Sequence, residues 1–223
     1  MPIPPTTSSP SNDAAIISAV AGISGVLLGG LITTLKDVLL NRSKNKADKT
    51  YLAILVGAHL NRYIEGCFHV SLDDGQSHDP YERNAEENLQ RRVEAPEFKP
   101  LDLKVEWKLL PPQLMADILG IPGEADRVES SLAGIAMQTD EPVEYFWARR
   151  EQWGYLGLKV VDVARRLRKH SGLPKPPKPE VDWSVAGALQ EAVDKVAAER
   201  KAHETRQAEI HARLLARANG DLV

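Results

Sequence analysis

Three side chains that could bind a metal or act as a nucleophile lie near one another in the sequence: His59, Cys67 and His69. Imidazole nitrogen and thiolate sulfur are common zinc ligands, and a thiolate is also a strong nucleophile. The spacing argues against a shared site, because Cys67 and His69 are two residues apart and their side chains would point about 200° apart on a helix. His59 falls on an apolar helix face, which is typical of a hydrogen-bonded core histidine. We therefore expect no metal and no cofactor here.

Cys67 leaves three interpretations open: a nucleophile, a palmitoylation site or a buried structural thiol. Its neighbours Ile64, Phe68 and Val70 favour burial, and buried thiols are inert. No nucleophile elbow, phosphate-binding loop, dinucleotide fingerprint or zinc-protease motif occurs in the chain. The sequence thus predicts a protein that is not an enzyme. An enzyme with a helical site built from His59, His69 and an acidic loop is the alternative.

The strongest signal is a run of 22 uncharged residues from Ala14 to Leu35, AAIISAVAGISGVLLGGLITTL. At 1.5 Å per residue, a helix of this length spans about 33 Å, enough for the roughly 30 Å hydrocarbon core of a bilayer. We therefore predict a transmembrane helix over residues 14–36, preceded by a disordered Pro- and Ser-rich tail over residues 1–13. A long buried helix of a soluble protein is the alternative.

The charges beside this run predict its orientation. The tail carries only Asp13, whereas five cations follow the run: Lys36, Arg42, Lys44, Lys46 and Lys49. The positive-inside rule then leaves the N-terminus outside and the C-terminal domain in the cytoplasm, in a single-pass protein of the inner membrane. The last four of these cations would also contact anionic lipid headgroups, worth about 1 kcal/mol each near the surface.

Small residues recur every fourth position within the run, at Ala21, Gly25 and Gly29. Such spacing lets two membrane helices approach closely, so that dispersion contacts hold them together. It predicts a homo-oligomer or pairing with another membrane protein. The alternative is that Gly and Ala are simply common in membrane helices.

Composition restricts the remaining possibilities. The chain has 28 basic and 31 acidic residues, a net charge of −3 and one cysteine. This balance excludes a strongly basic nucleic-acid binder, so no nucleic-acid partner is expected. A single cysteine also excludes an intrachain disulfide, in agreement with a reducing cytoplasm.

The rest of the chain predicts an all-α fold, with a small helical bundle over residues 37–172. Residues 73–100 are acidic and contain three prolines, which indicates a mobile loop, and the following LDLKVEWKLL has the partial alternation of an extended stretch. Pro111 and Pro112 predict the start of one short helix that ends at Gly120, and a second helix is predicted to begin after Pro122.

Residues 142–170 carry the clearest helical pattern. Gly154 and Gly157 weaken this helix by about 1 kcal/mol each, which indicates that another helix passes close by. Arg149 and Arg150 are expected to pair with acidic residues at the surface. A basic cluster at the helix end either stabilises the helix dipole or forms a surface for a lipid headgroup or an acidic partner: Arg165, Arg166, Arg168 and Lys169.

A Pro-rich linker over residues 173–180 precedes a long helix predicted over residues 181–218. Its candidate coiled-coil seam alternates in spacing between four and three residues: Leu189, Val193, Val196, Arg200, His203, Gln207, Ile210 and Leu214. Polar residues interrupt the middle of the seam, which argues against a stable isolated coiled coil. The pattern favours a helix that lies against the bundle or pairs weakly between subunits.

Three segments carry a resemblance to a broad set of bacterial proteins: residues 14–49, EWKLLPPQLMADIL at 106–119 and YLGLKVVDVARRLRKHSGLP at 155–174. The chain resembles uncharacterised members of that set, which have one N-terminal membrane helix, a basic stop and a small cytoplasmic helical domain. The resemblance implies this architecture and no activity. Two functions fit: a membrane-anchored interaction or scaffold protein, or a phage-encoded or defence-related membrane effector that oligomerises through its span.

Substituting Gly25 and Gly29 by Leu tests the association predicted for the membrane segment. Because bulky side chains hold two helices apart, the double substitution should weaken self-association in a membrane two-hybrid assay. An unchanged signal in that assay would contradict the prediction.

Overall fold

The structure is a computed structural model, and it describes residues 44–76, 89–139, 141–174 and 184–220. The chain divides into two compact units, Met1–Asp48 and Lys49–Val223. Only residues 44–48 of the first unit are described, and they are helical. The fold and the site discussed below belong to the second unit.

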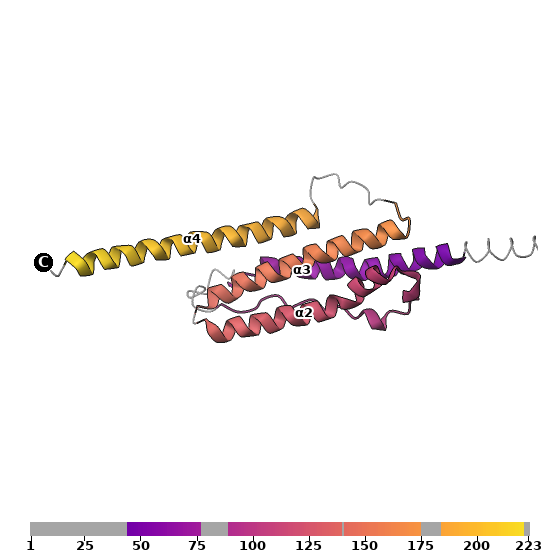
Figure 1. Cartoon of the computed structure of the whole chain (residues 1–223), viewed down its shortest axis with the longest axis horizontal. Helices are drawn as coiled ribbons and strands as arrows, with labels where there is room; N and C mark the ends of the chain where they lie inside the picture. The colour runs from indigo at the N-terminus through magenta and orange to yellow at the C-terminus, as the bar shows by residue number, and fades with distance from the viewer. Residues whose placement is uncertain (1–43, 77–88, 140, 175–183, 221–223) are drawn as a thin grey trace, which may run out of the picture. The chain divides into compact units, whose positions relative to one another are not determined.

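The described residues contain helices and no strand, which confirms the predicted all-α class (Figure 1). Residues 44–72 form the first helix. Two short 3-10 helices follow, η1 (Pro100–Asp102) and η2 (Trp107–Leu109), and then three long helices: α2 (Pro112–Gln138), α3 (Pro142–His170) and α4 (Val185–Gly220).

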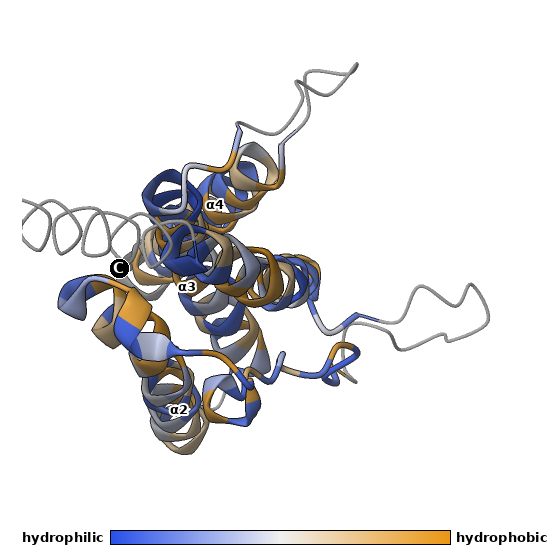
Figure 2. Ribbon diagram, turned by 90° about the vertical axis from the view of Figure 1, so that its right-hand side faces the viewer, coloured by the Kyte–Doolittle hydropathy of each residue, from blue (hydrophilic) through white to orange (hydrophobic). Residues whose placement is uncertain are grey.

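Helix α3 lies at the centre of the bundle, between α2 and α4 (Figure 2). Its buried side chains include Trp153, Val160 and Leu167, which are each at most 1% exposed. Gly154 and Gly157 form a notch on this helix. A Cβ atom at Gly154 would lie 2.5 Å from Val193 Cγ2, and one at Gly157 would lie 2.9 Å from Cys67 Cβ. The prediction that these glycines admit another helix is therefore confirmed, for both α4 and the first helix.

Helix α2 corrects the predicted break at Gly120. It runs unbroken through Pro122, although proline removes one backbone hydrogen bond from a helix interior. An apolar stripe continues across the proline, since Leu114, Ile118, Ile121 and Leu132 are all buried. Packing of this stripe against the bundle outweighs the local signal of the proline.

The segment between the first helix and α2 corrects a second expectation. LDLKVEWKLL forms two 3-10 turns with short connections, and no extended strand. Its side chains nevertheless pack across the bundle as expected, since Leu103, Val105 and Trp107 are partly buried against the core.

Helix α3 ends at His170, where the predicted helical pattern also ends. Gly172 has a φ of +68°, in the left-handed region that glycine adopts without a Cβ clash. This turn lets the Leu173 amide donate to the Arg168 carbonyl at 3.2 Å, which closes the helix end.

The expected membrane span, residues 14–36, lies outside the described residues. Within the part of the chain that the structure describes, no helix is both long and apolar enough to cross a bilayer.

Substituting Gly157 by Ala should lower the free energy of unfolding by up to about 2 kcal/mol. Overpacking against Cys67 and Leu189 costs about 1 to 3 kcal/mol, which exceeds the gain in helix propensity of about 1 kcal/mol. Gly134→Ala in α2 is the matched control, because nothing lies within 4 Å of its added Cβ, and it should stabilise the protein. Urea unfolding followed by circular dichroism would measure both variants, and a Gly157→Ala protein as stable as the wild type would contradict this account.

Candidate functional site

A fully buried ion pair joins α3 to the end of the first helix. Arg149 Nη1 donates to Asp73 Oδ2 at 2.7 Å, and the two side chains are 1% and 2% exposed. The backbone amides of Arg92 and Val93 donate to the same Asp73 oxygen, each at 3.0 Å. The other oxygen accepts from the Gly75 amide at 3.2 Å. Such additional bonds offset the cost of removing two charges from water.

Arg149 also binds the backbone of Val93. Its Nη2 donates to the Val93 carbonyl, so Val93 binds both members of the ion pair, while the Arg92 amide binds Asp73. The Arg149 Nε has no hydrogen-bond partner within the described residues. The pair thus fastens residues 73–75 and 92–93 to α3.

The environment of Asp73 changes its titration. Burial alone raises the pKa of a carboxyl group, but the donors from Val93, Arg92, Arg149 and Gly75 outweigh burial and lower the pKa of Asp73 below its usual value. The group is therefore an anion at neutral pH, and its charge is used structurally by Arg149.

The next residue, Arg150, binds α4. Its Nε donates to the Ser71 carbonyl at 3.2 Å, and its Nη1 donates to Glu199 Oε2 at 2.7 Å. A second ion pair between the helices joins Arg200 Nη1 to Glu151 Oε2 at 2.9 Å. Arg200, the first of the polar side chains that interrupt the predicted seam of α4, therefore binds α3.

His203 extends the contact between α3 and α4 by one turn. Its ring stands edge-on to the Trp147 ring, with 5.0 Å between the ring centroids. Beyond this residue every described side chain of α4, from 204 to 215, is exposed.

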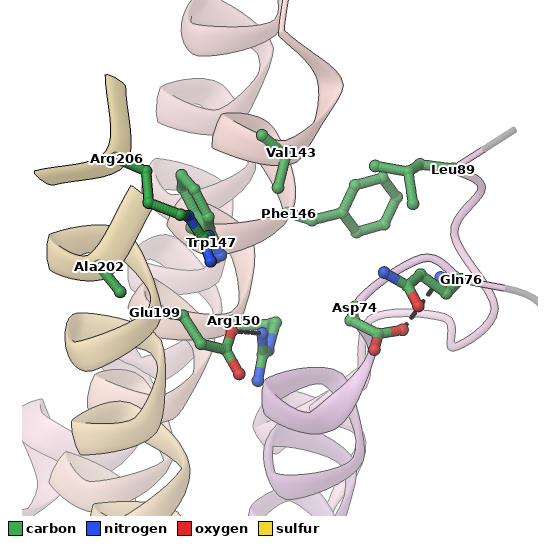
Figure 3. A pocket seen from close by; sticks show the side chains of 10 residues that line it. All are labelled: Asp74, Gln76, Leu89, Val143, Phe146, Trp147, Arg150, Glu199, Ala202 and Arg206. Atoms are coloured by element: carbon green, nitrogen blue, oxygen red, sulfur yellow. Dashed lines mark hydrogen bonds and ion pairs between the residues drawn. The ribbon is translucent and has the colours of Figure 1, made fainter. Parts of the chain in front are cut away.

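A pocket of about 330 Å³ opens where α3, α4 and the loop after the first helix meet (Figure 3). Phe146, Trp147 and Leu89 supply apolar surface, and Arg150, Glu199 and Arg206 supply charge. Gly75 makes room for this arrangement, because its φ is +78° and a Cβ atom there would lie 2.4 Å from the Phe146 ring. This pocket is the candidate site.

The predicted membrane and lipid residues are only partly described. Ala21, Gly25, Gly29 and Arg42 lie outside the described residues. Lys44 and Lys46 are exposed and Lys49 is half-buried on the first helix. Contact of these cations with lipid stays a prediction.

The four residues of the basic cluster lie together at the end of α3, but three of them already bind acidic or carbonyl groups of the same chain. Arg166 bridges Asp117 at 2.7 Å and Asp162 at 2.9 Å, and Arg165 also pairs with Asp162. Arg168 Nε donates to the Pro174 carbonyl at 2.6 Å, while Lys169 is exposed. A partner at this surface would have to compete with those contacts.

Cys67 is fully buried, as its neighbours predicted. Burial raises the pKa of its thiol to about 12, which leaves almost no thiolate at neutral pH. His59 is half-buried and His69 is exposed on the first helix. Among the described residues, no group of three His, Cys, Asp or Glu side chains is placed to hold a metal.

The expectation for Arg149 and Arg150 is wrong, because both arginines are buried rather than paired at the surface. One signal could have revealed them: both lie between the buried aromatic side chains of Phe146 and Trp153. A charge in the middle of such a stripe needs a buried partner. The partner itself, Asp73, is 76 residues away in the chain.

Substituting Asp73 by Asn should lower the free energy of unfolding by about 3 to 5 kcal/mol at pH 7, because it leaves Arg149 buried without its counter-charge. Since folding lowers the pKa of Asp73, its stabilising contribution is complete above the unfolded value of about 3.9 and declines as the pH falls further.

Urea unfolding across pH 3 to 7 would check this prediction. The difference between wild type and Asp73→Asn should shrink below about pH 4. The control Asp162→Asn removes two largely exposed ion pairs, with Arg165 and Arg166, and should cost about 1 kcal/mol. Equal losses in the two variants would contradict a special role for the buried pair.

Comparison with known proteins found no matching family model, no matching curated protein and no matching solved structure. What the chain does must therefore be inferred from its own side chains and their arrangement.

Proposed function

We propose that this chain is a membrane-anchored interaction protein that works through helical partner contacts and catalyses no reaction. The anchor is the uncharged run at residues 14–35, which has the length and composition of a membrane span. The basic residues after the run place the helical bundle in the cytoplasm in this proposal.

The observation that supports an interaction role is the two-part character of α4. Its first half is docked, with Leu189, Val193 and Val196 at most 2% exposed. Its second half projects past the start of α3 (Figure 1) and exposes large apolar side chains, with Ile210, Leu214 and Leu215 all more than half exposed. An isolated helix of that length is marginal in water. A partner that covered the apolar side chains would stabilise it.

The direction of α4 fits the same role. Within the second unit, the projecting half of α4 lies at the opposite end from the residues that follow Lys49 in the first helix (Figure 1). That arrangement favours a cytoplasmic partner, engaged by its own amphipathic helix.

A photocrosslinking amino acid, benzoylphenylalanine, placed at Leu214 in cells should form a discrete adduct that sediments with membranes. Leu214 continues the seam of α4, and a helix packed on that face would lie within reach of the probe. The same probe at Ala212 is the matched control, because position 212 points about 200° away on the same exposed helix.

Three results would tell against the proposal. Absence of an adduct at Leu214, or equal adducts at both positions, would contradict a partner on this face. A protein that remains in the soluble fraction would contradict the anchor.

A further inference from the structure

One cation in the pocket between α3, α4 and the loop after the first helix has no ion-pair partner among the described residues. Arg150 is neutralised by Glu199 at 2.7 Å, and Glu199 also lies 3.9 Å from Lys195. Arg206 lines the same pocket, and none of the described residues forms an ion pair or hydrogen bond with it. The α4 side of the pocket therefore has a guanidinium group available to an incoming anion.

The wall next to this cation is apolar and aromatic. Figure 3 shows Arg206 reaching from α4 toward Trp147, while the ring of Phe146 points toward Leu89. Phe146 and Trp147 are 4% and 7% exposed, so their positions are set by the packing of the bundle. Rigid aromatic surface of this kind binds flat rings and alkyl groups.

The remaining acidic group lies at the far side of the pocket. Asp74 is on the loop after the first helix, and its Oδ1 accepts a hydrogen bond from the Gln76 amide at 2.9 Å. Figure 3 shows it apart from Arg206. The field across the pocket thus favours a ligand whose negative end faces α4.

We propose that this pocket binds a small organic anion, with its carboxylate or similar group on Arg206 and its aromatic or aliphatic body against Phe146 and Trp147. A guanidinium group offers two parallel N–H donors to a carboxylate, which gives orientation as well as attraction. The pocket volume of about 330 Å³ is at the small end of the range for ligand pockets, which fits a ligand of one or two rings. This binding site is independent of the partner face at Leu214.

The test uses the full chain in lipid nanodiscs and two probes of the same shape, 2-naphthoate and the neutral 2-naphthamide. Saturation-transfer NMR would measure the affinity of each probe, and nanodiscs without protein supply the blank. The wild type should bind the carboxylate about fivefold more tightly than the amide, the size expected for an exposed ion pair. Equal affinity for the two probes would overturn the proposal.

Two pairs of variants locate the site. Arg206→Gln should remove the preference for naphthoate and leave naphthamide binding unchanged, whereas Arg213→Gln, an exposed arginine two turns further along α4, should keep the preference. Ala202→Trp should fill the pocket and abolish the binding of both probes, and Ala208→Trp should not. These substitutions are at exposed helix positions, so circular dichroism should show an unchanged fold. Undiminished naphthoate binding by Arg206→Gln or by Ala202→Trp would overturn the assignment.

Discussion

The buried ion pair between Arg149 and Asp73 is the contact on which the arrangement of the bundle depends. It joins segments far apart in the chain, because the donors to Asp73 come from α3 and from residues 92 and 93. A buried pair without further hydrogen bonds would destabilise the fold, since desolvation costs several kcal/mol per ion. Here Asp73 accepts four hydrogen bonds. The pair therefore fixes the route of the chain that frames the pocket.

The adjacent arginine directs the same helix toward a different neighbour. Successive residues on a helix are about 100° apart, so Arg149 reaches the loop while Arg150 reaches Ser71 and Glu199. Close approach of α4 then needs the notch at Gly154 and Gly157. Arg150 and the two glycines on α3 thus determine where α4 docks. The weak intrinsic helix propensity of those glycines is compensated by the apolar surface that their notch buries.

Local sequence patterns predicted the helices well and the contacts between distant segments poorly. The helical pattern and the glycines of residues 142–170 identified both α3 and the approach of another helix. The prediction of a helix break near Pro122 was wrong. A proline is a local signal, whereas the apolar stripe through Ile118 and Ile121 extends along the whole helix. The pairing of Arg149 with Asp73 leaves no local signal at a separation of 76 residues. The pocket could not be predicted for the same reason, since its walls come from three segments.

The polar residues that interrupt the seam of α4 make contacts that the sequence alone did not predict. Arg200 and His203 would weaken a coiled coil between subunits, yet they bind Glu151 and Trp147 on α3. The interruption therefore marks the end of the docked half rather than a flaw in a continuous coiled coil. Glu199 and Arg206 are seven residues apart and so share one helix face, but only Glu199 is neutralised by α3. Before His203 the buried side chains of α4 pack against the chain's own helices. After His203 the described side chains are exposed and available to other molecules.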